Sequence, residues 1–129
     1  ENEVRALEQH WQDFDFFYMH IKETDLAGED GDFTRKVSLI EAVDALLPRL
    51  TALAPEVLIV TGDHSTPAAL AAHSWHPVPL LLHARQARPD GVAEFGERAC
   101  GRGSLGVIPA KEIMPLALAH AGRLMKWRG

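Results

Sequence analysis

Acidic and imidazole side chains occur in three short clusters of the sequence, and all of them are residue types that bind metal ions. Asp25 and Glu29 lie in "KETDLAGEDGD", Asp63 and His64 are adjacent in "VLIVTGDHSTP", and His73 lies in "AAHSWHP". Carboxylate oxygens and imidazole nitrogens form the mixed donor set favoured by manganese, zinc or iron, whereas calcium and magnesium sites are mostly oxygen. The clusters therefore predict a metal site if the fold brings them together.

The pair Asp63–His64 also has a simpler interpretation. Asp63 could cap a helix that begins near Pro67, and His64 could face solvent, because helix caps are commoner than metal sites. Neighbouring residues of a strand point to opposite faces, so both side chains can reach one ion only if the strand has ended by Gly62, whose conformational freedom permits such a turn. One pair alone favours the cap, whereas three clusters together favour the metal site.

The hydrophobic pattern places these clusters between alternating strands and helices. Apolar residues at spacings of three and four predict helices, and short apolar runs predict strands. The predicted strands are 14–21, 56–61 and 78–84. The predicted helices are 2–12, 33–50 with an interruption at Pro48, a short helix from Thr66, and 110–125, with Asp30 or Asp32 placed to cap the helix that starts at Phe33. The predicted loops are 22–32 and 85–106, the second with room for one short helix.

Alternation of this kind is typical of an α/β fold with a mostly parallel sheet flanked by helices. Right-handed crossovers would place the carboxyl ends of the strands at one edge of the sheet, and ligands of open α/β sheets bind beyond that edge. The acidic and histidine clusters follow the predicted strands. We therefore expect Asp25, Asp63, His64 and His73 to lie close together at this edge.

Size and composition exclude several classes of protein. The chain has 129 residues, 47% of them hydrophobic, which suits one domain or one lobe of a larger domain. Its net charge of -5 argues against binding to nucleic acid and against a polybasic membrane anchor. No apolar run reaches the roughly 18–20 residues that span a bilayer, and the N-terminus lacks the pattern of a secretion signal. A single cysteine, Cys100, fits the reducing cytoplasm.

Three stretches together carry a resemblance to a known family. "MHIKETDLAGEDGDF", "VLIVTGDHSTP" and "AAHSWHPVPLLLHA", in this order and spacing, resemble the cofactor-independent phosphoglycerate mutases of the archaeal type, which belong to the alkaline phosphatase superfamily. "GERACGRGSLGVIPAKEIMPLALAHAGRL" is similar to the C-terminal end of that family. The resemblance implies interconversion of 3-phosphoglycerate and 2-phosphoglycerate in glycolysis and gluconeogenesis, through a phosphoserine intermediate.

The same resemblance implies two divalent metal ions, commonly manganese, with zinc, magnesium and cobalt as alternatives. By this resemblance Asp63 and His64 would bind the metal that also holds the nucleophilic serine, and Asp25 and His73 would bind the second metal. Many relatives carry a histidine ligand four residues after the aspartate that corresponds to Asp25, whereas this chain has Glu29 there. A carboxylate can still ligate, as a harder donor with an added negative charge, so we expect Glu29 to join the second metal.

The resemblance also implies parts that this sequence does not contain. Members of the family begin with a strand that carries a metal-binding aspartate, followed by the nucleophilic serine, and they insert a domain that grips the substrate. We therefore expect this chain to be the C-terminal part of an alkaline-phosphatase-like domain, with no catalytic nucleophile of its own and no mutase activity by itself; Ser65 and Ser74 do not replace that serine. Lys22 could steer a substrate phosphate, although an ordinary surface lysine is the simpler interpretation.

Two alternatives stay open at this point. Another phosphatase, phosphodiesterase or phosphopentomutase of the same superfamily would share the metal platform and differ in the inserted domain. A catalytically silent binding module would explain the lack of a serine without a longer chain. The partner in the main interpretation is a small phosphorylated substrate, and an exposed sheet edge could also support self-association.

Overall fold

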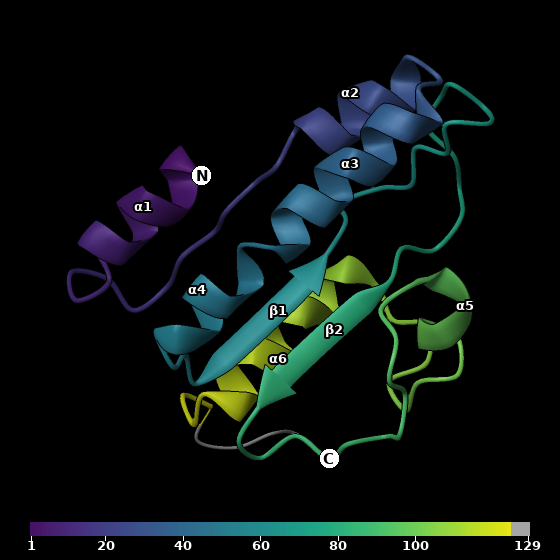
Figure 1. Cartoon of the computed structure of the whole chain (residues 1–129). Coiled ribbons are helices and arrows are strands. Elements are labelled where there is room, and N and C mark those ends of the chain that lie inside the picture. Colours follow the sequence, from purple (N-terminus) through teal and green to yellow (C-terminus); the bar gives the residue numbers. More distant parts are fainter. Residues whose placement is uncertain (125–129) are drawn as a thin grey trace. The chain divides into compact units, whose positions relative to one another are not determined.

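The structure is a computed structural model that describes residues 1–124, and it divides into two compact units. The first unit consists of residues 1–54 and 66–74, and the second consists of residues 55–65 and the chain from Trp75 onward (Figure 1). The chain therefore passes from the second unit into the first between Ser65 and Thr66.

The first unit is helical. Its helices are α1 (Asn2–Gln9), α2 (Glu23–Glu29), α3 (Phe33–Asp44) and α4 (Leu47–Ala52). Helices α2 and α3 lie side by side (Figure 1), and the turn between them contains Gly31, whose φ of 69° favours glycine. Asp32 caps α3, because its carboxylate accepts a hydrogen bond of 2.9 Å from the backbone N–H of Arg35. This confirms one of the two caps that the sequence predicts.

The predicted interruption of the helix at 33–50 is also confirmed. Helix α3 ends at Asp44 and α4 begins at Leu47, with Pro48 in its first turn, where a missing N–H costs nothing. The Arg49 guanidinium of α4 donates two hydrogen bonds to the Glu8 carboxylate of α1, at 2.9 and 2.6 Å. These bonds hold the pKa of Glu8 below its usual value, because they stabilise the charged form.

Two predictions for the first unit are wrong. The predicted loop 22–32 contains helix α2, whose acidic first turn suits the positive end of a helix dipole and whose Gly28 allows close packing against Thr66. The predicted strand 14–21 pairs with no strand among the described residues, and Phe14, Phe16 and Tyr18 are exposed along it. His20, at the end of this stretch, is exposed and stacks on Tyr18. An aromatic run has strand propensity, but a strand also needs a partner.

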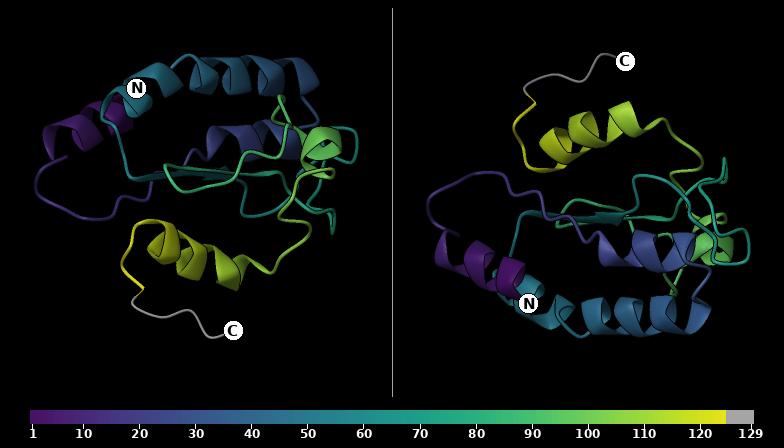
Figure 2. Two further views of the ribbon diagram at one scale, coloured as in Figure 1. Left: turned by 90° about the horizontal axis from the view of Figure 1, so that it is seen from below. Right: turned by 90° about the horizontal axis from the view of Figure 1, so that it is seen from above.

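The second unit contains the sheet. Strands β1 (Val57–Thr61) and β2 (Leu80–Ala84) pair with Val57 opposite Ala84 and Thr61 opposite Leu80. Helix α6 (Ile113–His120) packs along one face of this sheet through β1, as both views of Figure 2 show. It follows a short 3-10 turn, η1 (Ala110–Glu112), and α5 (Glu97–Cys100) is the short helix foreseen in the loop region. Met125, the last residue of the predicted helix 110–125, lies outside the described residues.

The protein thus has a mixed fold of helices and a small sheet, but the parallel sheet is a wrong prediction for the described strands. β1 and β2 are antiparallel. A parallel pair needs a crossover connection, usually a helix, and the residues between these strands contain no helix. The predicted helix from Thr66 is a single turn in which Leu70 and Ala71 donate backbone hydrogen bonds to the Pro67 carbonyl, at 2.9 and 3.1 Å.

Few side chains are fully buried in either unit. Val4 and Ala27 are buried in the first unit, and Ala84 and Ala99 are buried in the second. No helix of residues 1–124 is both long enough and apolar enough to cross a membrane.

Helix α2 approaches Thr66 so closely that only glycine fits at position 28. A Cβ atom built on Gly28 would lie closer to the Thr66 carbonyl oxygen than real Cβ atoms lie to anything, and 2.9 Å from Lys36 Nζ. The lysine could move, but the carbonyl belongs to the backbone. The first unit therefore depends on the absence of a side chain at this point.

We expect Gly28→Ala to lower the free energy of unfolding by about 1–3 kcal/mol, the usual cost of overpacking, although alanine at a helix interior otherwise stabilises by up to about 1 kcal/mol. Urea unfolding followed by circular dichroism measures the change. Gly96→Ala is the matched control, because an added Cβ meets nothing within 4 Å there and φ is -178°. Equal stability of the Gly28→Ala variant and the parent would contradict the close approach.

Candidate metal centre

Asp25 and Glu29 lie on the same face of helix α2, because residues four apart in a helix are neighbours. The imidazole of His73, which lies in the segment 66–74 of the first unit, faces both of them. His73 Nε2 lies 3.5 Å from Asp25 Oδ1 and 3.2 Å from Glu29 Oε1. The structure therefore brings together three of the side chains that the sequence singled out, two from a helix and one from a loop.

Asp25 is the most enclosed of the three. Its side chain is 11% exposed, compared with 44% for Glu29 and 53% for His73. Oδ1 accepts a hydrogen bond of 2.5 Å from the Thr66 hydroxyl, and Oδ2 pairs with the Lys22 ammonium group at the start of α2. Asp25 is thus held by a hydroxyl and a cation as well as by the imidazole.

The pairs Asp25–His73 and Glu29–His73 each have a separation that suits two ligands of one divalent metal ion. Two ligand atoms bound at about 2.1 Å to one ion lie about 3.0 Å apart at a right angle and about 3.4 Å apart at the tetrahedral angle. The separations of 3.2 and 3.5 Å from His73 Nε2 are close to that range. Both carboxylates and an imidazole suit manganese, zinc or iron, so the donor chemistry agrees with the geometry.

Asp63 and His64 belong to the second unit and follow β1 after Gly62, as predicted. Asp63 Oδ1 accepts a hydrogen bond of 3.1 Å from the backbone N–H of His64, and Asp63 Oδ2 lies 3.5 Å from His64 Nε2. The capping interpretation fails, because the chain forms only a turn at Pro67. β1 ends at Thr61, so the strand has ended by Gly62 as predicted, but the φ of Gly62 lies outside the left-handed region, so other residues could adopt this backbone.

Sequence reasoning missed Thr66. It is the one polar residue among the described residues that is buried, with 4% of its surface exposed. Its hydroxyl contacts Asp25, and its carbonyl oxygen accepts a hydrogen bond of 2.5 Å from Lys36 Nζ on α3. Nothing in "HSTP" signals this burial, because it follows from the packing of α2 and α3 around the segment.

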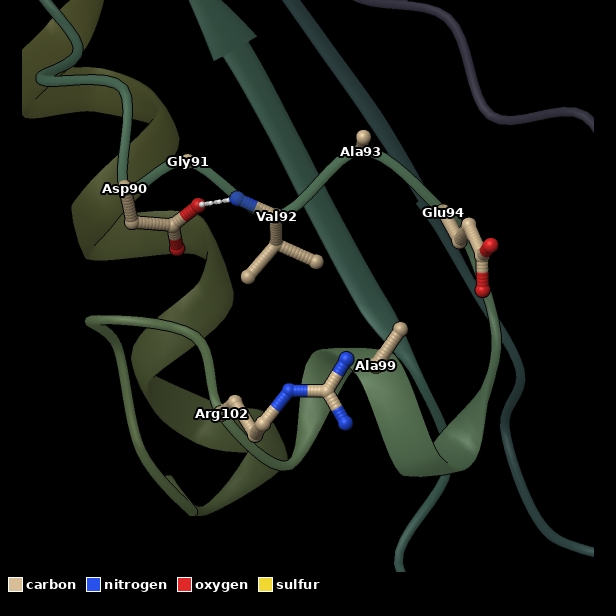
Figure 3. Close-up of a pocket in the computed structure, with 7 residues that line it drawn as sticks. All are labelled: Asp90, Gly91, Val92, Ala93, Glu94, Ala99 and Arg102. Carbon is tan, nitrogen blue, oxygen red and sulfur yellow. Dashed lines mark hydrogen bonds between the residues drawn. The ribbon is translucent and has the colours of Figure 1, made fainter.

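The second unit contains a separate cavity of about 360 Å³, lined by residues 90–94, Ala99 and Arg102 (Figure 3). The Asp90 carboxylate accepts hydrogen bonds from the backbone N–H groups of Ser104 at 2.9 Å and Val92 at 3.1 Å. These bonds, with Ser104 as the larger cause, lower the pKa of Asp90, because they stabilise its charged form. Asp90 therefore joins two loops, and the cavity has no imidazole in its lining.

The chain belongs to the Metalloenzyme superfamily, whose family model matches residues 1–120. It is 57% identical over 127 residues to a "Probable 2,3-bisphosphoglycerate-independent phosphoglycerate mutase" of Thermus thermophilus, and 55% identical over 127 residues to a protein of the same name from Thermotoga neapolitana. These alignments cover 98% of this chain and 31% and 32% of the relatives. The chain thus spans about a third of the length of the curated relatives that it matches, and the names confirm the resemblance found in the sequence.

A solved structure is also similar. The structure of the PH0037 protein from Pyrococcus horikoshii matches with a TM-score of 0.92 and 34% sequence identity, over 98% of this chain and 39% of that one. Membership of a superfamily of metalloenzymes and the donor set around His73 both support the use of a divalent metal.

The two hydrogen bonds of Asp90 lead to a prediction for the second unit. We expect Asp90→Ala to speed amide exchange of Val92 and Ser104 on the order of tenfold, because each loses a charge-assisted hydrogen bond. Since folding lowers the pKa of Asp90, protection in the parent should persist as the pH falls to about 3.9, the ordinary value, and disappear only below it. NMR-detected hydrogen exchange measures both effects.

Glu94→Gln is the matched control, because it removes a carboxylate that lines the same cavity (Figure 3). Unchanged exchange of both amides in Asp90→Ala would show that Asp90 does not join the loops.

Proposed function

We propose that this chain forms the C-terminal part of a 2,3-bisphosphoglycerate-independent phosphoglycerate mutase and supplies ligands to its divalent metal ions. The observation that carries the proposal is the convergence of His73 on Asp25 and Glu29, at 3.5 and 3.2 Å. It occurs in a chain whose relatives carry the name of that enzyme at 57 and 55% identity. The substrate would be a small phosphorylated acid, and the compartment the cytoplasm.

We assign Asp25, Glu29 and His73 to one metal ion, and Asp63 and His64 to the other. A short stretch of chain connects the two groups. Two peptide units separate His64 from Thr66, so their Cα atoms are at most about 7.6 Å apart. Thr66 in turn hydrogen-bonds to Asp25. Ser65 is therefore the only residue between His64 and Thr66, the hydrogen-bond partner of Asp25.

Bound divalent ions would stabilise the negative charge that develops on phosphoryl and serine oxygens during transfer between the two hydroxyl groups of glycerate. The residues that we propose as ligands would hold these ions in position. Lys22, which now pairs with Asp25, is the residue that we propose to steer the phosphate group. Two carboxylates and one imidazole around the first ion favour manganese over zinc, because manganese prefers harder oxygen donors.

Product analysis tests the reaction. The protein expressed from the complete reading frame is given 3-phosphoglycerate and manganese without 2,3-bisphosphoglycerate, and phosphorus NMR follows the products. We expect 2-phosphoglycerate to form without release of inorganic phosphate. Release of inorganic phosphate would indicate a phosphatase of the same superfamily, and no turnover with any phosphoester would indicate a binding module; either outcome contradicts the mutase.

We expect His73→Ala and Asp63→Ala each to remove nearly all activity, by more than the roughly 10–100-fold that loss of a ligand's outer-shell partner costs. Steady-state kinetics at saturating manganese measure the loss. His10→Ala is the matched control, because His10 also faces an aspartate, with Nδ1 2.8 Å from Asp13 Oδ2, and is similarly exposed, but belongs to neither proposed ligand group. Ordinary turnover in either test variant would reject the ligand assignment.

A further inference from the structure

We infer that Thr66 is a positioning residue that fixes Asp25 in the orientation that ligates metal. The inference rests on the proposed metal centre. Its starting point is the burial of Thr66, which is 4% exposed, next to a carboxylate whose side chain is 11% exposed. A buried hydroxyl needs a hydrogen-bond partner, and here the partner is the carboxylate itself.

The direction of the hydrogen bond is set by chemistry. An ionised carboxylate only accepts, so the Thr66 hydroxyl donates to Asp25 Oδ1 across 2.5 Å. That length is at the short end of the range for hydroxyl groups bound to charged oxygens, which are the stronger class of hydrogen bond. Oδ1 is also the oxygen that lies 3.5 Å from His73 Nε2. The hydroxyl therefore acts on the oxygen that faces the imidazole.

The donor is itself held in place. Threonine is branched at Cβ and has few χ1 rotamers. Its carbonyl oxygen accepts from Lys36 Nζ at 2.5 Å, and its backbone lies against Gly28, one turn beyond Asp25 on α2. Thr66 thus contacts α2 and α3 together, and its hydroxyl cannot follow the carboxylate if Asp25 rotates.

Metal ligands are commonly oriented by such outer-shell hydrogen bonds, and their loss typically weakens metal affinity about 10–100-fold. A threonine that served packing alone would tolerate valine, which has nearly the same shape. A positioning threonine needs its hydroxyl, and serine can supply it. The two substitutions therefore separate the roles.

Manganese titration followed by electron paramagnetic resonance tests the inference in the protein expressed from its complete reading frame. We expect Thr66→Val to weaken binding of one ion about 10–100-fold, and Thr66→Ser to stay within a few fold of the parent. Thr24→Val is the matched control. It removes a hydroxyl from α2, the helix of Asp25, and this hydroxyl donates to the Ile21 carbonyl at 3.3 Å and not to Asp25.

Thermal unfolding with and without manganese gives the second readout. A packing role lowers the unfolding temperature of Thr66→Val equally in both conditions, whereas a positioning role reduces the rise that manganese produces. Parent-like affinity and a parent-like rise in Thr66→Val would overturn the inference while leaving the metal centre intact. Absence of manganese binding in the parent would overturn the metal centre itself, and this inference with it.

Discussion

The close approach of Thr66 to helix α2 is the contact on which the first unit depends. It requires glycine at position 28, because any Cβ there would meet the Thr66 carbonyl, and it lets Lys36 of α3 bond to the same carbonyl. One residue thus joins α2, α3 and the segment that returns from the second unit. The enclosure of Asp25 follows from this contact, since its carboxylate accepts a hydrogen bond from the Thr66 hydroxyl.

Enclosure makes the charge of Asp25 costly unless it is compensated. A like charge at Glu29, four residues along the same helix, adds repulsion. Lys22, Thr66 and His73 each stabilise the Asp25 carboxylate in the structure. The arrangement still gathers two acids around one imidazole, and a divalent cation would neutralise both acids at once. The electrostatics therefore agree with the family in pointing to a metal.

The sequence predicts local features well and long-range pairing poorly. The cap at Asp32, the break before Pro48 and the strand near 57–61 depend on neighbouring residues, and all three are present. Helix α2 was missed because glycines lower helix propensity, whereas its stability comes from packing that includes Gly28. The antiparallel pairing of β1 and β2 was missed because an apolar run does not encode the direction of its partner. Residue types pointed to the proposed metal ligands, but Thr66 required the fold.

The glutamate at position 29 gives the proposed metal centre a second carboxylate. Asp25 and Glu29 are spaced by one helical turn, so a histidine at position 29 would face the same place. The glutamate carboxylate reaches 3.2 Å from His73 Nε2, within the separation expected for ligands of one ion. What changes is charge and hardness rather than position, because a carboxylate adds a negative charge that an imidazole lacks. A centre with this composition should hold a hard dication more firmly, and a soft one less firmly, than the same centre with a histidine at position 29.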